Sequence, residues 1–263
     1  MSYMFNNCKQ WEVTCRSTYV APKNYNVSNV TNMEHMFAGC SKISRLELPN
    51  WKTSNVTNMS GMFTRCTSLA KIDFSGWDTK KVTTMADMFF YCTAITNVDL
   101  KSFNTPELTT MKAMFKQCYK LSTVNLSSFD LSKVSDMSYM FYGCKNGPVI
   151  DLRVSKKIKS GVSMYYIFYD TWDSTEKYGG VFLDINDNFL VTTSQNCGWP
   201  TKPDDYFNYC PVYVTTNDRS VVSATKMAII TTMKNMGYKG AWTGEKPSFL
   251  YKFSNGKSEW IEY

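Results

Sequence analysis

Apolar side chains recur along this chain in an eight-residue phrase, Met-x-x-Met-Phe-x-x-Cys, that returns at a fixed interval. Five copies start 26 residues apart, at Met33, Met59, Met85, Met111 and Met137. A further copy starts at Met1, and a weaker one, MYYIFYDT, follows at Met164. An internal repeat of this length indicates one structural unit stacked many times.

Within the phrase, Met59, Met62, Phe63 and Cys66 stand at i, i+3, i+4 and i+7. This spacing places four side chains on one stripe of a helix and predicts a short amphipathic helix in each repeat. A hydroxyl residue precedes each phrase and is expected to cap the helix by accepting an orphan amide hydrogen. These predicted caps are Thr57, Thr83, Thr109 and Ser135.

A second pattern, apolar-x-x-apolar-x-apolar, follows each phrase, as at Leu69, Ile72 and Phe74. Its alternation predicts a short strand with one buried face. An aromatic residue such as Trp77 comes three residues later, in a turn that returns to the next copy. Because one unit cannot bury its apolar face alone, stacked copies with strands in a parallel ladder are expected. The predicted fold class is an α/β solenoid, a leucine-rich-repeat stack of about six to seven turns.

The repeat text from Asn55 to Thr79, NVTNMSGMFTRCTSLAKIDFSGWDT, resembles the BspA-like leucine-rich-repeat proteins. The resemblance covers roughly residues 1–168. Members of that family are mostly surface-displayed, non-enzymatic proteins that bind host or matrix components. The resemblance therefore implies adhesion or receptor recognition for this chain.

The pattern of repeats divides the chain into four predicted parts. Residues 1–32 hold an N-terminal cap and the first irregular repeat, 33–152 the regular repeats, and 153–178 a degenerate last repeat and cap. Residues 179–263 begin at a Gly-Gly pair and predict a small C-terminal α+β domain. In it we expect a hairpin around Asn186, a helix over 223–236 and a hairpin over 249–263. The Asn255-Gly256 turn of the last hairpin would place Tyr251 opposite Trp260.

Polar side chains follow the outward face of the predicted strands in a column. They are Arg45, Glu47, Lys71, Asp73, Asn97, Asp99, Thr123, Asn125 and Asp151. Neighbouring strands lie about 4.8 Å apart, so the carboxylates form a column of like charge. One interpretation is that Arg45, Lys71, water and backbone donors neutralise it. The other is a polar strip that binds a ligand or a cation.

The cysteines predict a structural column. Cys8, Cys40, Cys66, Cys92, Cys118 and Cys144 share one phrase position and are expected to stack as buried free thiols. Their spacing of one cysteine per turn matches no metal-binding motif, so no metal site is predicted. Cys197 and Cys210 flank a loop and are a possible disulfide in an oxidising compartment.

Near the end of the repeats, aromatic residues cluster at Tyr165, Tyr166, Tyr169 and Trp172, where we expect a cap or an interface. The net charge is +7 without a run of like charge, which makes nucleic acid an unlikely partner. Expected partners are a protein, a surface glycan or neighbouring subunits of a larger assembly.

No window predicts a membrane span, and the N-terminus lacks the features of a signal peptide. Met1 falls inside a phrase, which is expected either for a piece of a longer secreted protein or for a virion component. The predicted location is extracellular or on a virion surface.

No catalytic motif accompanies the single histidine, His35, and no cofactor-binding motif occurs. The sequence therefore predicts a protein that is not an enzyme and needs no cofactor. The leading hypothesis is recognition of a protein or glycan through the strand face. The alternatives are a structural virion component, such as a tail, fibre or capsid accessory protein, and a small enzyme domain on a repeat stalk.

Overall fold

The computed structural model describes residues 18–20, 26–48, 51–146, 148–159 and 161–171, together with the backbone of four later strands. Its ten strands are β1 (Thr18–Val20), β2 (Arg45–Glu47), β3 (Lys71–Asp73), β4 (Asn97–Val98), β5 (Thr123–Asn125), β6 (Val149–Leu152), β7 (Val181–Ile185), β8 (Val212–Thr215), β9 (Ser248–Lys252) and β10 (Ser258–Glu262). The described residues contain no helix. Among them, no segment has the helical length and apolar character needed to cross a membrane.

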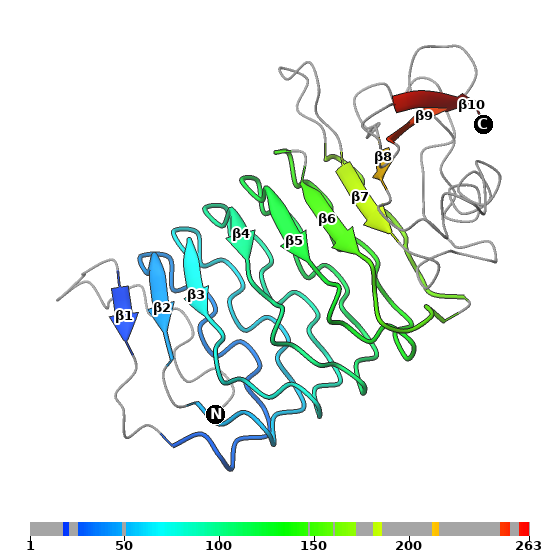
Figure 1. Cartoon of the computed structure of the whole chain (residues 1–263). Helices are drawn as coiled ribbons and strands as arrows, with labels where there is room; N and C mark the ends of the chain where they lie inside the picture. The colour runs from blue at the N-terminus through cyan, green and yellow to red at the C-terminus, as the bar shows by residue number, and fades with distance from the viewer. Residues whose placement is uncertain are drawn as a thin grey trace.

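Strands of successive repeats lie side by side (Figure 1). β1, β2 and β3 form one parallel sheet, and β4 to β10 form a second sheet in which only β9 and β10 are antiparallel. Arg45 pairs with Lys71 and Asn97 pairs with Thr123, so a step of 26 residues brings equivalent positions together. β7 to β10 continue the sheet of β4 to β6 across residue 179. The predicted division into domains stays a prediction.

The phrases form a second parallel ladder, and the prediction of a helix in each of them is wrong for the described copies. Alternate amides donate to the next repeat, as from His35 N to Ser60 O at 2.9 Å and from Phe37 N to Met62 O at 2.9 Å. The amides between them close tight turns, as from Met36 N to Met33 O at 3.2 Å. The third and seventh phrase residues take positive φ angles, 51° at His35 and 75° at Gly39. A right-handed helix cannot contain such residues, so the chain forms two successive turns instead.

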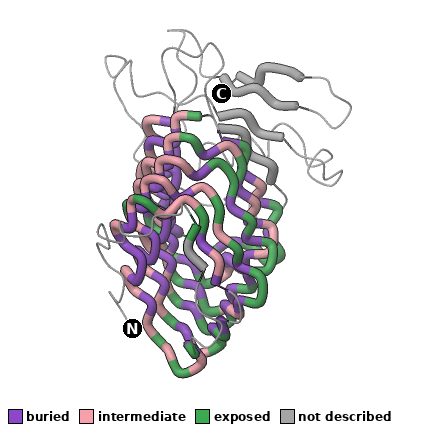
Figure 2. The backbone as a smooth tube through the Cα atoms, turned by 90° about the vertical axis from the view of Figure 1, so that its left-hand side faces the viewer, coloured by how far each residue is buried: buried purple, intermediate pink, exposed green. Residues whose placement is uncertain are grey.

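The predicted buried stripe is confirmed even though the element differs. Met59, Met62, Phe63 and Cys66 are each at most 1% exposed. Phenylalanines at the same position stack from repeat to repeat, with ring centroids 5.3 to 5.9 Å apart from Phe37 to Phe168. Buried segments recur in every turn of the stack (Figure 2). Two tight turns, like a helix, leave these four side chains on the inner side of the chain.

The cysteine column is also confirmed for the copies that the structure describes. Cys40, Cys66, Cys92, Cys118 and Cys144 are buried thiols. The Cys92 thiol donates to Phe63 O at 3.0 Å, and the same bond recurs at Cys66, Cys118 and Cys144. Burial, aided by the neighbouring thiols, raises the pKa of Cys66, Cys92 and Cys118 well above the ordinary range. Cys8, Cys197 and Cys210 lie outside the described residues.

The hydroxyl groups predicted to cap helices bond the preceding repeat instead. The Thr83 hydroxyl donates to Thr57 O in the preceding repeat at 3.1 Å, and Thr57, Thr109 and Ser135 do the same. The next residue along the chain accepts the amide hydrogen instead, as Asn58 Oδ1 does from Ser60 N at 2.8 Å. These hydroxyls therefore reinforce the ladder, because no helix start is present to cap.

A column of buried threonines was not predicted. Thr53, Thr79 and Thr105 are at most 1% exposed and lie in the return turns. The Thr79 hydroxyl donates to Asn104 O and accepts from Asn104 N, both at 2.9 Å. The Thr53 hydroxyl bonds Asp78 O and N in the same way, and the Thr105 hydroxyl accepts from Asp130 N at 3.0 Å. These buried hydroxyls therefore satisfy backbone groups of the following repeat.

Two predictions for the C-terminal strands need correction. β9 and β10 pair antiparallel as predicted, but Tyr251 lies opposite Glu259 and not Trp260. Lys252 pairs with Ser258, so an odd number of residues connects the strands and a two-residue turn does not fit. The hairpin around Asn186 is also wrong, because β7 lies between β6 and β8 and is parallel to both. The predicted helix over 223–236 lies outside the described residues.

Replacing Thr79 with valine should lower the free energy of unfolding by about 1 to 3 kcal/mol, because it removes both hydrogen bonds between the buried Thr79 hydroxyl and the Asn104 backbone. Urea unfolding followed by circular dichroism measures this change. The control is Thr83→Val, whose hydroxyl is exposed and whose loss should cost less than about 0.5 kcal/mol. Equal losses in the two variants would show that the buried threonines have no special role.

Candidate functional site

The nine predicted ladder residues all lie along the outward face of the strands of the repeats. Arg45 and Glu47 belong to β2, and their successors occupy β3, the segment at and just after β4, β5 and β6. They alternate with buried residues, since Leu46 between the first two is 1% exposed. The face is therefore polar and lies directly over the core.

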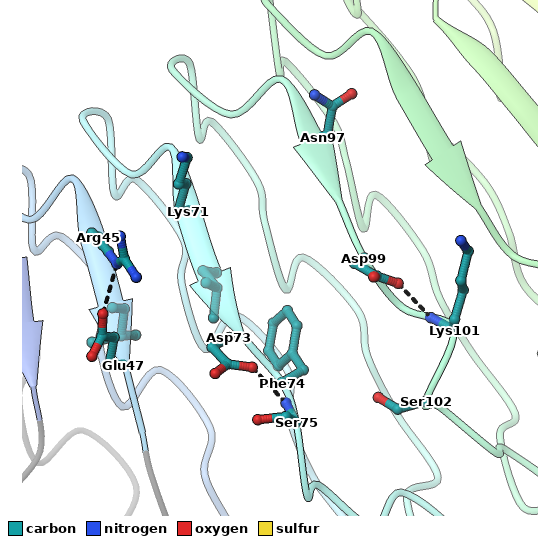
Figure 3. Close-up of a pocket in the computed structure, with 12 residues that line it drawn as sticks. Arg45, Glu47, Lys71, Asp73, Phe74, Ser75, Asn97, Asp99, Lys101 and Ser102 are labelled. Atoms are coloured by element: carbon teal, nitrogen blue, oxygen red, sulfur yellow. Dashed lines mark hydrogen bonds and ion pairs between the residues drawn. The ribbon is translucent and has the colours of Figure 1, made fainter.

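Two adjoining hollows open on this face. The larger, about 610 Å³, spans β2 to β4, and the smaller, about 380 Å³, spans β4 to β6. Figure 3 shows the larger one, with its polar side chains arranged along neighbouring strands. The larger hollow is lined by Arg45, Leu46, Glu47, Lys71, Ile72, Asp73, Phe74, Ser75, Asn97, Asp99, Lys101 and Ser102. The smaller adds Thr123, Asn125 and Asp151, so every predicted ladder residue lines one hollow or both.

The larger hollow lies where the sheet is interrupted. β3 pairs with β2 but not with β4, whereas β4 pairs with β5. Ile72 of β3 is partly exposed, although Val98 at the equivalent position of β4 is 6% exposed. The phrase side remains continuous across this break, because Phe63 N still donates to Met88 O at 2.9 Å. The repeats therefore separate only on the strand side.

Phe74 is the residue that we expect to cause the interruption. It occupies the position held by Leu48, Leu100 and Leu126 in the other repeats. Its ring packs edge-on against Phe103 of the following repeat, with centroids 5.2 Å apart, and against Phe89 at 6.2 Å. A ring that projects into the next repeat needs more space between the strands than leucine does.

The column of carboxylates is stabilised mainly by backbone amides. Asp73 accepts from Ser75 N at 2.8 Å, Asp99 from Lys101 N at 3.1 Å and Asp151 from Arg153 N at 3.0 Å. Asn125 accepts from Ser127 N at 2.9 Å in the same way. Each side chain closes a local turn at the end of its strand. Like charges are tolerated in a row because Asp73, Asp99 and Asp151 each have an amide donor, and Glu47 has Arg45.

The pKa values of two of these groups are lowered. For Asp73 the main cause is the hydrogen bond from the Ser75 amide, followed by the Ser75 hydroxyl. For Asp151 burial is the largest single effect and would raise the pKa, but the hydrogen bonds and charge of Arg153 outweigh it. Both carboxylates are therefore ionised at neutral pH, which suits hydrogen bonding to a ligand and not proton donation.

Ion pairs neutralise only the two ends of the face. Arg45 pairs with Glu47 at 2.7 Å, and Arg153 pairs with Asp151 at 2.7 Å. The predicted neutralisation by Arg45 is thus present, but neither Lys71 nor Lys101 forms an ion pair with a described residue. The middle of the face keeps two ammonium groups and two carboxylates, Asp73 and Asp99, without an ion-pair partner in the described part of the chain. Within the described ranges, no group of three or more His, Cys, Asp or Glu side chains is placed to hold a metal.

The predicted tyrosine interface is a packed cluster on the phrase side. The rings of Tyr165 and Tyr166 lie 4.1 Å apart and those of Tyr166 and Tyr169 lie 4.6 Å apart. A hydrogen bond with Tyr165, together with burial, raises the pKa of Tyr166 to about 12. Trp172 lies outside the described residues.

The prediction missed the extension of this cluster into earlier repeats. Tyr139 lies 5.7 Å from Tyr166, and the Lys116 ammonium lies 4.9 Å from the centre of the Tyr139 ring. Tyr139 and Tyr166 occupy the third position of the phrase, which is Gly61 in the copy that starts at Met59. They take positive φ angles of 59° and 53°. A bulky residue in this conformation costs on the order of 1 kcal/mol. The sequence signal for this extension is the change, toward the later repeats, from small to aromatic residues at the outward positions of the phrase.

Comparison with known proteins identifies the repeats. The family described as "Mycoplasma protein of unknown function, DUF285" matches residues 1–123 and again residues 70–178. The two matches overlap, so together they cover 178 of the 263 residues. The chain belongs to this family. Membership in DUF285 assigns no activity, and no curated protein or solved structure matches the chain.

Replacing Phe74 with leucine should allow β3 to pair with β4, because the side chain then matches those of the other repeats. Hydrogen exchange followed by mass spectrometry should show slower exchange in the peptide over 94–100. We expect the variant to lose about 1 to 2 kcal/mol of stability through the smaller buried volume. Phe129→Leu removes a similar volume elsewhere and should leave that peptide unchanged. Unchanged exchange in the Phe74 variant would show that another feature separates the strands.

Replacing Asp151 with asparagine should cost about 1 kcal/mol at pH 7, because it removes the ion pair with Arg153. The pKa of Asp151 is lowered in the folded protein, so its contribution is present above the unfolded value of about 3.9 and is lost as the pH falls. The stability difference between the two proteins should therefore shrink between pH 7 and pH 3. Urea unfolding at both pH values measures it, and a constant difference would contradict the assignment.

Proposed function

We propose that this DUF285 chain is a non-enzymatic recognition protein of the BspA-like leucine-rich-repeat type. In this proposal the repeats form a solenoid whose strand face binds a protein or a glycan at a cell or virion surface. The resemblance of the repeats to BspA-like proteins supports it, and such surface proteins carry this domain.

The observation that carries the proposal is the pair of hollows on the strand face. Side chains from every repeat strand between β2 and β6 line them. Repeat proteins use extended faces of this kind for binding, because each repeat adds one row of variable side chains to a common frame. The hydrogen-bonded turns fix the carboxylates in place, so a ligand meets side chains that are already ordered.

The chemistry of the face favours binding over catalysis. The hollows are open and combine charged and polar side chains with apolar surface. Their carboxylates with lowered pKa values accept hydrogen bonds without supplying protons. The ammonium groups of Lys71 and Lys101 supply donors beside them. Such a mixture of fixed donors and acceptors gives specificity for a polar ligand.

A fourfold variant with alanine at Arg45, Lys71, Asn97 and Thr123 tests the proposal. Fluorescent full-length protein is applied to arrays of extracellular proteins and of oligosaccharides. We expect saturable binding by the natural chain and a loss of about tenfold or more in the variant, since each lost polar contact weakens binding by about 1 kcal/mol.

The control is Glu107→Ala combined with Lys133→Ala, which removes an exposed ion pair of 2.7 Å from the return turns. This protein should bind like the natural chain, within about twofold. The proposal fails if no array feature binds, or if the fourfold variant binds as well as the control.

A further inference from the structure

We propose that the hollow at the break between β3 and β4 binds a neutral oligosaccharide. This inference rests on the proposed function and names the ligand class for one part of the strand face. Three features of the hollow carry it: the balance of its charges, the arrangement of its donors and acceptors, and the partly exposed apolar floor left by the interruption of the sheet.

The charges that line the hollow cancel. Arg45, Lys71 and Lys101 supply three positive charges, and Glu47, Asp73 and Asp99 supply three negative ones. Sites for nucleic acids or sulfated glycans need an excess of Lys and Arg, because binding rests on the release of counterions. A hollow without net charge gains little from a charged ligand. It therefore favours a ligand that is polar but neutral.

Donors and acceptors alternate along the hollow. The Lys71 and Lys101 ammonium groups and the Asn97 amide donate hydrogen bonds. Asp73 and Asp99 each use one oxygen for a backbone amide, and they keep further lone pairs for a ligand. A sugar hydroxyl both donates and accepts, so it bonds an ammonium group and a carboxylate at the same time. Charge-assisted bonds of this kind are the stronger ones.

The break supplies the apolar part of the site. Ile72 is partly exposed at its floor, whereas Leu46 beside it is 1% exposed. Aliphatic surface next to polar groups suits the C–H face of a sugar ring. The volume of about 610 Å³ falls in the usual range for small-ligand sites.

An extended peptide fits the break less well. Peptides that add to a sheet need a free edge with about 4.8 Å of spacing on each paired side. β3 and β4 belong to consecutive repeats that stay hydrogen-bonded on the phrase side, as from Phe63 N to Met88 O. That ladder restricts how far the strands can separate, so a new strand has no room between them.

Titration calorimetry with the full chain tests the proposal. The probes are neutral tetrasaccharides of glucose, galactose, mannose and N-acetylglucosamine, with a sulfated tetrasaccharide and an uncharged decapeptide as comparison ligands. We expect one of the neutral tetrasaccharides to bind. Its affinity should change less than about twofold between roughly 50 and 500 mM salt, because no net charge is involved.

The test variant combines Asp73→Asn and Asp99→Asn. Asn125 already closes the same turn in the next repeat with a bond of 2.9 Å, so asparagine keeps the fold. The control combines Asp78→Asn and Asp136→Asn, which changes two carboxylates that close similar turns outside the hollow. Affinity for the neutral tetrasaccharide should fall about tenfold in the test variant and stay within twofold in the control.

Three results would overturn the inference. One is that no neutral tetrasaccharide binds, and another is that both double variants bind alike. The third is that the sulfated ligand or the peptide binds at this hollow instead. In each case the proposed function still stands if the array experiment shows binding that depends on Arg45, Lys71, Asn97 and Thr123. If that binding is also absent, both proposals fail.

Discussion

The backbone hydrogen bonds between equivalent positions of successive repeats are the constraint on which the rest of the structure depends. They run along two sides of the stack, between strands such as β4 and β5 and between phrases such as 33–40 and 59–66. Because the copies from Met33 to Met137 start 26 residues apart, equivalent side chains of these repeats meet one another in the stack. The stacked phenylalanines, the thiols bonded to carbonyls and the threonine column all follow from this register. The repeat that starts at Met137 is one residue longer, yet Phe141 still stacks on Phe168 with ring centroids 5.9 Å apart, so the added residue leaves this column in register.

The hydrophobic pattern predicts what is buried better than it predicts the local backbone. Met59, Met62, Phe63 and Cys66 are buried as expected, but they lie in two turns and not in a helix. A spacing of three and four residues between buried side chains is common to a helix and to two successive turns, so periodicity alone cannot distinguish these two structures. The useful signal is glycine at the third or seventh phrase position, as at Gly39 and Gly61, which is unusual inside a helix. The hydroxyl groups were assigned wrongly for the same reason, since a cap needs a helix.

The sequence predicts where the candidate site lies, but it does not predict the shape of the hollow. Alternation along the strands places Glu47 and Asp73 on the outer face, and the structure agrees. We attribute the hollow to the change from leucine to Phe74, whose effect depends on how close the rings of the next repeat lie. The hairpin register of β9 and β10 was missed because it depends on the length of a connection and not on the strand pattern. The tyrosine cluster joins side chains from different repeats, so reading one phrase at a time underestimates it.

The turns at the strand ends explain how the face can change while the fold stays constant. One oxygen of Asp73, Asp99 or Asn125 accepts a backbone amide, and this bond closes the turn whether the side chain is aspartate or asparagine. The remaining polar group of each side chain is available to solvent or to a ligand. This group is a charged oxygen in aspartate and a neutral amide in asparagine. In the proposed function, exchange of aspartate for asparagine at these positions changes the group offered to a ligand while the turn is kept. A stack of such repeats separates the requirements of folding from those of binding, residue by residue along one face.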